Sequence, residues 1–404
     1  MKIGVDLRSL EGGAQHRGIG RYATELIQAL SQVDHHNEYV FFVSHPKAVP
    51  PEFKLHPKFM TSAAHGRGQG WRGVKYARIL AITGRPLSVD SYDVDVFFQI
   101  DMTQPIRVRS TPVVSVVYDL IPFLYKDMYQ KVHLGGYTPG HLIGYSRMRL
   151  QWTRYYQWLQ RYKDSARIIS ISEHSKRDLM KFVPGIDPEK IIVTPLAAGG
   201  PPPTGAAQSE RLKKLGLKHF LFYVGGADPR KGLVAFTKSM EVVWQKHPDT
   251  QVVFAGKEVL AEDVPEAVKL RKTAEASSRP KQIKRLGFIS DEELGWLYGH
   301  AAAFIWPSRY EGFGLPILEA MQAGCPVVTY DNSSLPEVTG TAALLVKDGK
   351  SMAPAIIKLL DDESLRKRLV KDGKAQAAKF TWAKTAKATL VALEAAGHSK
   401  TGVK

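Results

Sequence analysis

The stretch Trp306–Glu319 reads WPSRYEGFGLPILE, and the rest of the chain is best interpreted outward from it. Two glutamates, Glu311 and Glu319, flank a glycine-rich turn. The apolar run Ala301–Ile305 predicts a buried parallel strand before the turn, and a helical apolar face follows it. A helix N-terminus suits a phosphate, and a carboxylate accepts hydrogen bonds from neutral sugar or ribose hydroxyls. The segment therefore predicts a pocket for a nucleotide sugar.

Size and composition are those of a globular protein with room for two domains. The chain has 404 residues, 44% of them hydrophobic and 24% charged. No run approaches the roughly 18 uninterrupted apolar residues of a membrane span, and Met1–Asp6 reads as a strand, not as a signal peptide. The single cysteine, Cys325, excludes an internal disulfide and fits a reducing compartment. We expect it to be a packing residue in a cytoplasmic protein.

The net charge of +17 calls for a partner or for a basic solvent-facing surface. Residues 54–89 hold seven Lys/Arg and no acid, and residues 131–181 hold ten Lys/Arg against three acids. Nucleic acid, an anionic membrane surface and an anionic lipid-linked substrate would each explain these clusters. Residues 140–162 interleave aromatic side chains with arginines, which suits lipid headgroups. A long helix buried on one side is the interpretation we favour for most of that stretch.

Two alternating patterns of strands and helices flank a break. The first half predicts strands at Lys2–Leu7, Glu38–Val43, Val94–Gln99, Val113–Val117, Ala166–Ile171 and Ile191–Thr194, with helices at Gly20–Ser31 and Lys176–Phe182. The break, Ala198–Gly205, reads AGGPPPTG and predicts a linker. The second half predicts strands at Phe220–Val224, Thr250–Phe254, Gln282–Leu286, Ala303–Ile305, Pro326–Thr329 and Ala342–Val346. This α/β alternation predicts two doubly wound parallel sheets, with ligands at the carboxyl ends of their strands.

A second motif, Tyr223–Leu233, reads YVGGADPRKGL. A strand ends in Gly225 and Gly226, and Arg230 and Lys231 then enter a helix. Two cations at a helix N-terminus suit a diphosphate leaving group in a site without metal.

No metal site is predicted. Asp93-Val94-Asp95 lies in an apolar context that predicts a buried strand, whereas a hard cation needs several convergent oxygens. The histidines show no ligand spacing. The glycine loop 12–20 does not match the dinucleotide fingerprint, which argues against a nicotinamide cofactor.

The EGFGLPILEAMQAGCPVV context of the two glutamates resembles retaining glycosyltransferases of family 4, which have the GT-B fold of two Rossmann-like domains facing each other across a cleft. The resemblance covers nearly the whole chain and is strongest from 220 to 346. It implies an acceptor-binding domain over 1–198, a linker over 199–214 and a donor-binding domain over 215–379. It also implies that a C-terminal helix near 380–396 packs back on the first domain.

The resemblance implies a role for each matching residue. Arg230 and Lys231 would hold the diphosphate, Glu311 the sugar and Glu319 the ribose. Backbone groups complete the donor site, at Gly18, Gly20, Gly225, Gly226, Gly287, Phe288, Ile289, Gly312, Phe313, Gly314 and Leu315. Many relatives have an arginine where Gly226 stands and a histidine where Tyr118 stands. Tyr118 and Asp119 follow the strand Val113–Val117 and are candidates beside the reacting sugar, while Ser172 and Ser175 are expected to cap a helix.

The resemblance implies a metal-independent, retaining transferase that moves a hexose from a nucleotide-diphosphate sugar to a hydroxyl of a glycan or lipid-linked acceptor. GDP-mannose is the first guess for the donor, in surface polysaccharide assembly. No cofactor and no nucleic-acid partner are expected. An anionic membrane surface is a further candidate partner, on the inner face of the plasma membrane. The alternatives are a same-fold hydrolase, epimerase or phosphorylase, and a non-catalytic protein that binds anionic lipid or nucleic acid.

Overall fold

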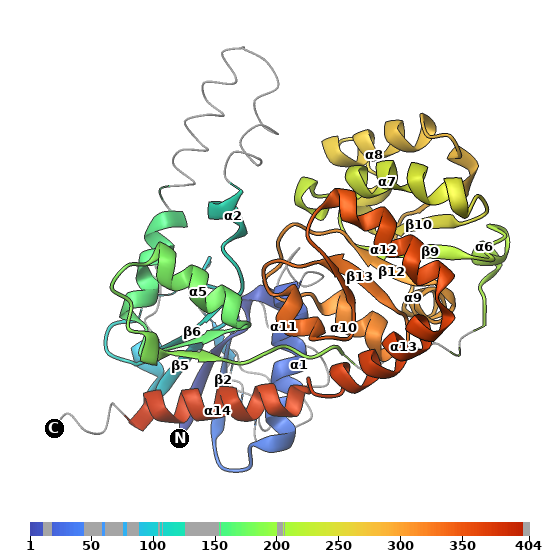
Figure 1. Ribbon diagram of the computed structural model, residues 1–404. Coiled ribbons are helices and arrows are strands. Elements are labelled where there is room, and N and C mark those ends of the chain that lie inside the picture. Colours follow the sequence, from blue (N-terminus) through green and yellow to red (C-terminus); the bar gives the residue numbers. More distant parts are fainter. Residues whose placement is uncertain are drawn as a thin grey trace. The chain divides into compact units, whose positions relative to one another are not determined.

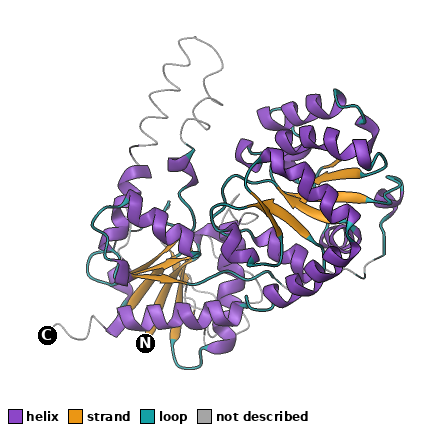
Figure 2. Ribbon diagram, in the orientation of Figure 1, coloured by secondary structure: helices purple, strands orange, loops and turns teal. Residues whose placement is uncertain are grey.

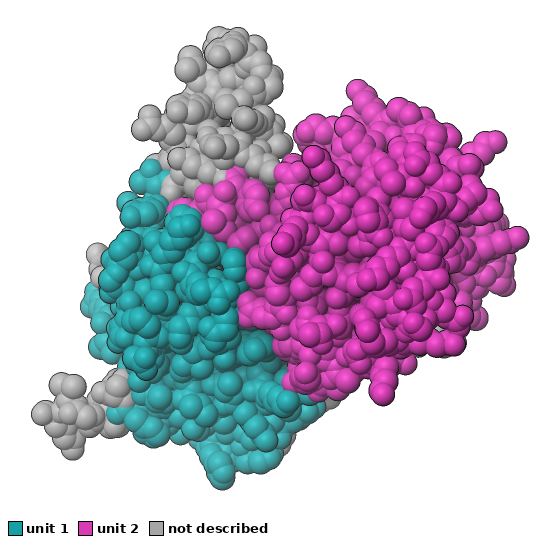
Figure 3. Space-filling model, viewed as in Figure 1, with its two compact units in different colours: residues 1–120, 133–196, 381–404 teal, residues 121–132, 197–380 magenta. Residues whose placement is uncertain are grey.

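The computed structural model describes residues 1–10, 18–43, 59–60, 76–78, 89–103, 106, 108–125, 153, 155–199, 205 and 207–398. These residues form two compact units, coloured teal and magenta in Figure 3. The first contains residues 1–120, 133–196 and 381–404, and the second contains residues 121–132 and 197–380. Within each unit, helices cover both faces of a parallel sheet, as Figure 2 shows. This is the α/β class predicted from the sequence.

The first unit contains an eight-stranded sheet in which every described pairing is parallel. Its order is β3-β2-β1-β5-β6-β7-β8, and β4 also pairs with β2. The strands are β1 (Lys2–Asp6), β2 (Glu38–Val43), β3 (Phe59–Met60), β4 (Tyr76–Arg78), β5 (Val96–Gln99), β6 (Val113–Val117), β7 (Arg167–Ser170) and β8 (Ile191–Val193). Near-continuous burial along β1, β2, β5 and β6 explains why they read as apolar runs without alternation.

Among the described residues, the first unit contains the helices α1 (Gly18–Val33), α5 (Glu173–Phe182) and α14 (Trp382–His398). The last helix packs against α1, β5, β6 and β7, so the C-terminal part of the chain belongs to the first unit (Figure 1). Thr385 fixes its start, because its hydroxyl donates to the Pro195 carbonyl at 2.6 Å. Asn37 donates to Glu394 at 3.1 Å nearer its end.

The second unit contains a six-stranded parallel sheet in the order β11-β10-β9-β12-β13-β14. Its strands are β9 (Phe220–Val224), β10 (Gln251–Ala255), β11 (Ile283–Leu286), β12 (Ala303–Trp306), β13 (Val327–Tyr330) and β14 (Leu344–Val346). This is the doubly wound order, which reverses direction between β9 and β12. The carboxyl ends of those two strands are therefore where a ligand is expected.

The helices of the second unit lie before, between and after these strands in the sequence. They are α2 (Ile121–Leu124), α6 (Glu210–Lys213), α7 (Leu233–Lys246), α8 (Pro265–Glu275), α9 (Asp291–His300), α10 (Leu315–Gln322), α11 (Leu335–Thr339), α12 (Gly349–Asp361) and α13 (Glu363–Ala377). Helix α7 packs against α8 and α12, and α10 packs against α13. The predicted strand, glycine turn and helix N-terminus around Glu311 are confirmed as β12, the turn at 307–314 and α10.

Candidate active site

The strand β9 delivers two basic residues to the point where the sheet order reverses. After Val224 the chain passes Gly225 and Gly226 and enters the 3-10 helix η8 (Pro229–Lys231). Asp228 caps this helix, because its carboxylate accepts the Arg230 N–H at 2.9 Å. Gly232 then takes a left-handed conformation, with φ +70°, and α7 begins. The sequence thus folds the motif so that Arg230 and Lys231 lie just beyond the strand end.

The glycine at 232 is required by its conformation and by its neighbour. A Cβ atom there would lie 2.3 Å from the carbonyl oxygen of Pro307, so the two loops of the site meet at this point. We expect Gly232→Ala to lower the free energy of unfolding by roughly 3 kcal/mol or more, because backbone strain and a backbone clash add. Gly216→Ala is the matched control, since Gly216 also has a positive φ but no atom within 4 Å of its Cβ position.

Chemical denaturation of the two variants measures this difference. The control should lose only about 1–2 kcal/mol, the cost of the left-handed conformation. Equal losses at the two positions would contradict the close approach of the two loops.

The strand β12 delivers Glu311 to the same place. The Glu311 carboxylate lies 2.6 Å from Lys231 Nζ and 3.1 Å from Arg230 Nη1. All three side chains are largely buried. The turn is fixed by two hydroxyls: Ser333 Oγ accepts the Glu311 N–H, and Ser334 Oγ donates to the Glu311 carbonyl. The structure therefore brings together the three side chains that the two sequence motifs singled out.

The cluster favours the charged form of Glu311, whereas burial disfavours the charged form of Lys231. Burial by itself would raise the pKa of Glu311, but Lys231 and then Arg230 outweigh it and hold the pKa below its usual value. Burial lowers the pKa of Lys231, with Glu311 opposing this shift and Arg230 adding to it. The ammonium of Lys231 also lies 4.3 Å from the ring centroid of Trp306. A desolvated cation is stabilised by such a ring face, so Trp306 supports the position of Lys231.

Glu319 lies inside helix α10. It is 4% exposed, and its carboxylate accepts a hydrogen bond from the Tyr298 hydroxyl at 3.2 Å. Helix α10 begins after Gly314, whose φ is +116°. The backbone of Gly312, Phe313, Gly314 and Leu315 thus leads from Glu311 directly into a helix N-terminus, a favourable place for an anion.

The predicted nucleobase loop is held by its neighbours. The carbonyl of Gly287 accepts the Gly256 N–H at 3.0 Å, and that of Phe288 accepts Arg211 Nη1 at 2.9 Å. The Phe288 side chain is 75% exposed, and Ile289 is half-buried. Ser290 and Glu293 form the predicted capping box at the start of α9.

The candidate residues of the first unit lie at the carboxyl end of β6 and at the start of α1. Gly18 and Gly20 are in the first turn of α1, while the loop residues 11–17 before them fall outside the described residues. Tyr118 packs edge-on against Tyr22, with ring centroids 5.4 Å apart. Its hydroxyl is buried and has no hydrogen-bond partner among the described residues. Burial, with Tyr22 and Asp101 nearby, raises the pKa of Tyr118 well above its usual value, which keeps the hydroxyl protonated.

The remaining residues that the sequence singled out have structural roles. Ser172 caps α5 by accepting the Ser175 N–H at 3.0 Å, and Ser175 Oγ donates to the Tyr118 carbonyl at 2.7 Å. Cys325 is buried, which raises the pKa of its thiol and fits a packing role. The Asp95 carboxylate accepts the Lys2 N–H at 2.7 Å. The basic run 54–89 and the aromatic run 140–162 lie mostly outside the described residues.

Several residues of the site were not predicted from the sequence. Glu258 lies just beyond β10, and its carboxylate accepts the Ala227 N–H at 3.1 Å. A Cβ atom on Gly226 would lie 2.6 Å from the same carboxylate. The sequence could have indicated Glu258 as a site residue, because it follows a glycine at the end of a predicted strand beside β9. Trp306 and Tyr298 give no such signal, since both read as core aromatics.

Two absences apply to the described residues only. Within the part of the chain that the structure describes, no three His, Cys, Asp or Glu side chains gather in a way that could hold a metal ion. In the same part of the chain, no helix is long and apolar enough to cross a membrane.

Solved structures of the same fold cover nearly the whole chain. Sucrose-phosphate synthase from Thermosynechococcus elongatus has a TM-score of 0.64 at 16% identity, covering 97% of this chain and 98% of its own. Anabaena Alr3699/HepE in complex with UDP has a TM-score of 0.66 at 14% identity, covering 98% of this chain and all of its own. These likenesses show the GT-B class of fold, as predicted from the sequence.

A known protein family matches part of the second unit. Residues 206–376 match the family of glycosyl transferases group 1. The resemblance to glycosyltransferases found in the sequence is confirmed for this segment.

Two curated relatives of the chain are named mannosyltransferases. The chain is 33% identical over 227 residues to O-antigen chain mannosyltransferase B of Escherichia coli, covering 54% of this chain and 58% of that protein. It is 27% identical over 280 residues to the serotype-specific mannosyltransferase WbdA of Escherichia coli, covering 68% of this chain and 32% of that protein. The chain therefore spans less than two thirds of either relative.

Proposed function

We propose that the protein is a retaining glycosyltransferase that moves a hexose from a nucleotide-diphosphate sugar to a hydroxyl of a glycan or lipid-linked acceptor. The observation that carries the proposal is the cluster of Arg230, Lys231 and Glu311 beyond β9 and β12. Two buried cations offer fixed charge to a diphosphate, and the adjacent carboxylate suits sugar hydroxyls. A nucleotide-sugar donor contains both a diphosphate and a sugar, so the cluster matches both parts of it.

The cations would act mainly in the bond-breaking step. The bond between the sugar C1 and the phosphate oxygen breaks, and its electron pair leaves with the diphosphate. Arg230 and Lys231 stabilise the charge that develops there, in a largely water-excluded place where preorganised charge is most effective. The acceptor oxygen bonds to C1 from the face that the leaving group vacates. Its proton passes to the departing phosphate oxygen, so no enzymic nucleophile is needed.

The donor sugar is proposed to be mannose, carried by GDP. The support comes from the two Escherichia coli relatives, both of which are named mannosyltransferases. We further propose that the protein acts in the cytoplasm, where it binds an anionic membrane surface peripherally.

A panel of nucleotide sugars tests the proposed function. The protein is incubated with each donor, with and without octyl α-mannoside as acceptor, and both the released nucleotide and the glycosylated acceptor are measured. Nucleotide release matched by acceptor product supports the proposal. Release at the same rate without acceptor, with free sugar as product, would instead identify a hydrolase. If no donor releases its nucleotide, the result contradicts both the transferase and the hydrolase.

We expect the reaction to proceed without a divalent cation, because Arg230 and Lys231 supply the positive charge that the leaving diphosphate needs. Initial rates are compared after EDTA treatment and after addition of Mg²⁺ or Mn²⁺. The rates should agree within about twofold. A tenfold or greater loss in EDTA that Mg²⁺ or Mn²⁺ restores would overturn metal independence.

A further inference from the structure

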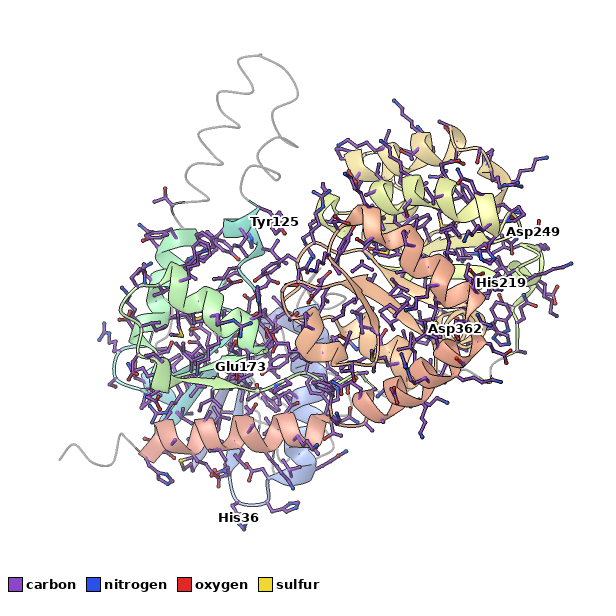
Figure 4. All side chains as sticks on the ribbon, viewed as in Figure 1. His36, Tyr125, Glu173, His219, Asp249 and Asp362 are labelled. Atoms are coloured by element: carbon purple, nitrogen blue, oxygen red, sulfur yellow. The ribbon has the colours of Figure 1, made fainter. Side chains whose placement is uncertain are left out.

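Tyr125 reaches the loop that carries Glu311. It follows the short helix α2, and its N–H donates to the Ile121 carbonyl at 2.9 Å. The described residues 121–125 belong to the second unit. The Tyr125 hydroxyl donates to the Arg309 carbonyl at 3.2 Å, and its ring packs edge-on against Tyr310 with centroids 6.0 Å apart. Figure 4 labels Tyr125 at the end of α2.

The two residues that Tyr125 contacts are themselves attached to the cationic side of the site. The Arg309 N–H donates to the Arg230 carbonyl at 2.8 Å. The Tyr310 carbonyl accepts Arg230 Nη1 at 2.7 Å, and Arg230 in turn pairs with Glu311. A shift of the 309–310 turn would therefore move both a backbone and a side-chain partner of Arg230.

The surroundings of Tyr125 agree with a place at the edge of the charged cluster. Burial raises the pKa of Tyr125, while the fields of Arg230 and Arg309 lower it and those of Glu311 and Asp228 raise it. Its hydroxyl therefore stays a hydrogen-bond donor at neutral pH, which the contact with the Arg309 carbonyl requires.

We propose that Tyr125 is a positioning residue of the donor site, which braces the 309–310 turn so that Arg230 and Glu311 are held ready for a nucleotide-diphosphate sugar. This inference rests on the proposed function. Tyr125 acts through the turn and through Arg230, and it needs no contact with the sugar. Its removal should therefore weaken recognition of the diphosphate and the donor while leaving recognition of the acceptor unchanged.

The test compares Tyr125→Phe, which removes only the hydroxyl, with Tyr125→Leu, which also removes the aromatic contact. Tyr92→Phe is the matched control, because Tyr92 packs edge-on against Phe42 in the first unit, before strand β5. GDP and UDP binding are measured by calorimetry, and kcat and KM are measured for the donor and the acceptor. Thermal unfolding is recorded for each variant.

We expect a roughly three- to tenfold loss of nucleotide affinity and donor kcat/KM in Tyr125→Phe, the size of one neutral hydrogen bond. Tyr125→Leu should lose more, and the acceptor KM should stay unchanged in both variants. The control should match the wild type.

Unchanged donor kinetics in both Tyr125 variants of a working transferase would overturn the positioning role alone. An equal rise of donor and acceptor KM together with a fall in unfolding temperature would show a merely structural role and also overturn it. A wild-type protein that neither binds these nucleotides nor transfers sugar would instead overturn the proposed function.

Discussion

Replacing Glu311 by glutamine should lower kcat by about a hundredfold or more, a loss of roughly 3 kcal/mol of transition-state stabilisation. The substitution keeps the shape of the side chain and removes the charge that pairs with Lys231 at 2.6 Å. The affinity for the nucleoside diphosphate should be retained or increased, because the carboxylate no longer competes for the two cations. Steady-state kinetics and calorimetry with the same preparation measure the two effects separately.

Glu275→Gln is the control for this substitution, since Glu275 is exposed at the end of α8. It should leave kcat and nucleotide affinity unchanged. A wild-type kcat in the Glu311→Gln protein would show that the carboxylate takes no part in the reaction. A parallel loss of nucleotide affinity would show that Glu311 acts by arranging the cations and makes no contribution of its own to the sugar.

Replacing Lys231 by methionine should have the opposite effect on binding. Methionine keeps an apolar stem against Trp306 and removes the ammonium. Charge-assisted contacts in a buried site are worth about 1.5–3 kcal/mol each, so the affinity for a nucleoside diphosphate should fall about ten- to a hundredfold. The rate of transfer should fall further, because the negative charge on the leaving group grows in the transition state.

Lys238→Met, on the exposed face of α7, is the matched control and should behave like the wild type. A measured affinity of Lys231→Met within twofold of the wild type would contradict the assignment of Lys231 to the diphosphate. Lys231→Arg is informative in the same series, because it keeps the charge but changes its position. It should recover part of the binding and less of the rate.

Most of the sheet could be predicted from the sequence because buried parallel strands are continuous apolar runs. Glu38–Val43, Val113–Val117 and Phe220–Val224 have the predicted bounds, and the other predicted strands differ by a few residues at their ends. The short strands β3 and β4 were not predicted, since Phe59–Met60 and Tyr76–Arg78 are too brief to show a period. Their pairing with β2 depends on contacts distant in the sequence.

The donor side of the site was predicted because its chemistry is concentrated in two short motifs. Arg230, Lys231 and Glu311 lie in the loops that follow β9 and β12, and parallel strands bring their carboxyl ends to one edge. Tyr125 could not be predicted in the same way. Its role depends on where the chain runs after β6. Nothing in the local sequence indicates that Tyr125 contacts the turn at Arg309.

Calorimetric titration of the protein with GDP, UDP and ADP, repeated with Lys231→Met, tests most directly whether this cluster is a donor diphosphate site. The predicted result is saturable one-to-one binding of at least one of the three nucleotides, weakened about ten- to a hundredfold by the substitution. Binding that is absent with every nucleotide, or equally tight in the two proteins, would contradict the assignment of Arg230, Lys231 and Glu311 to the donor.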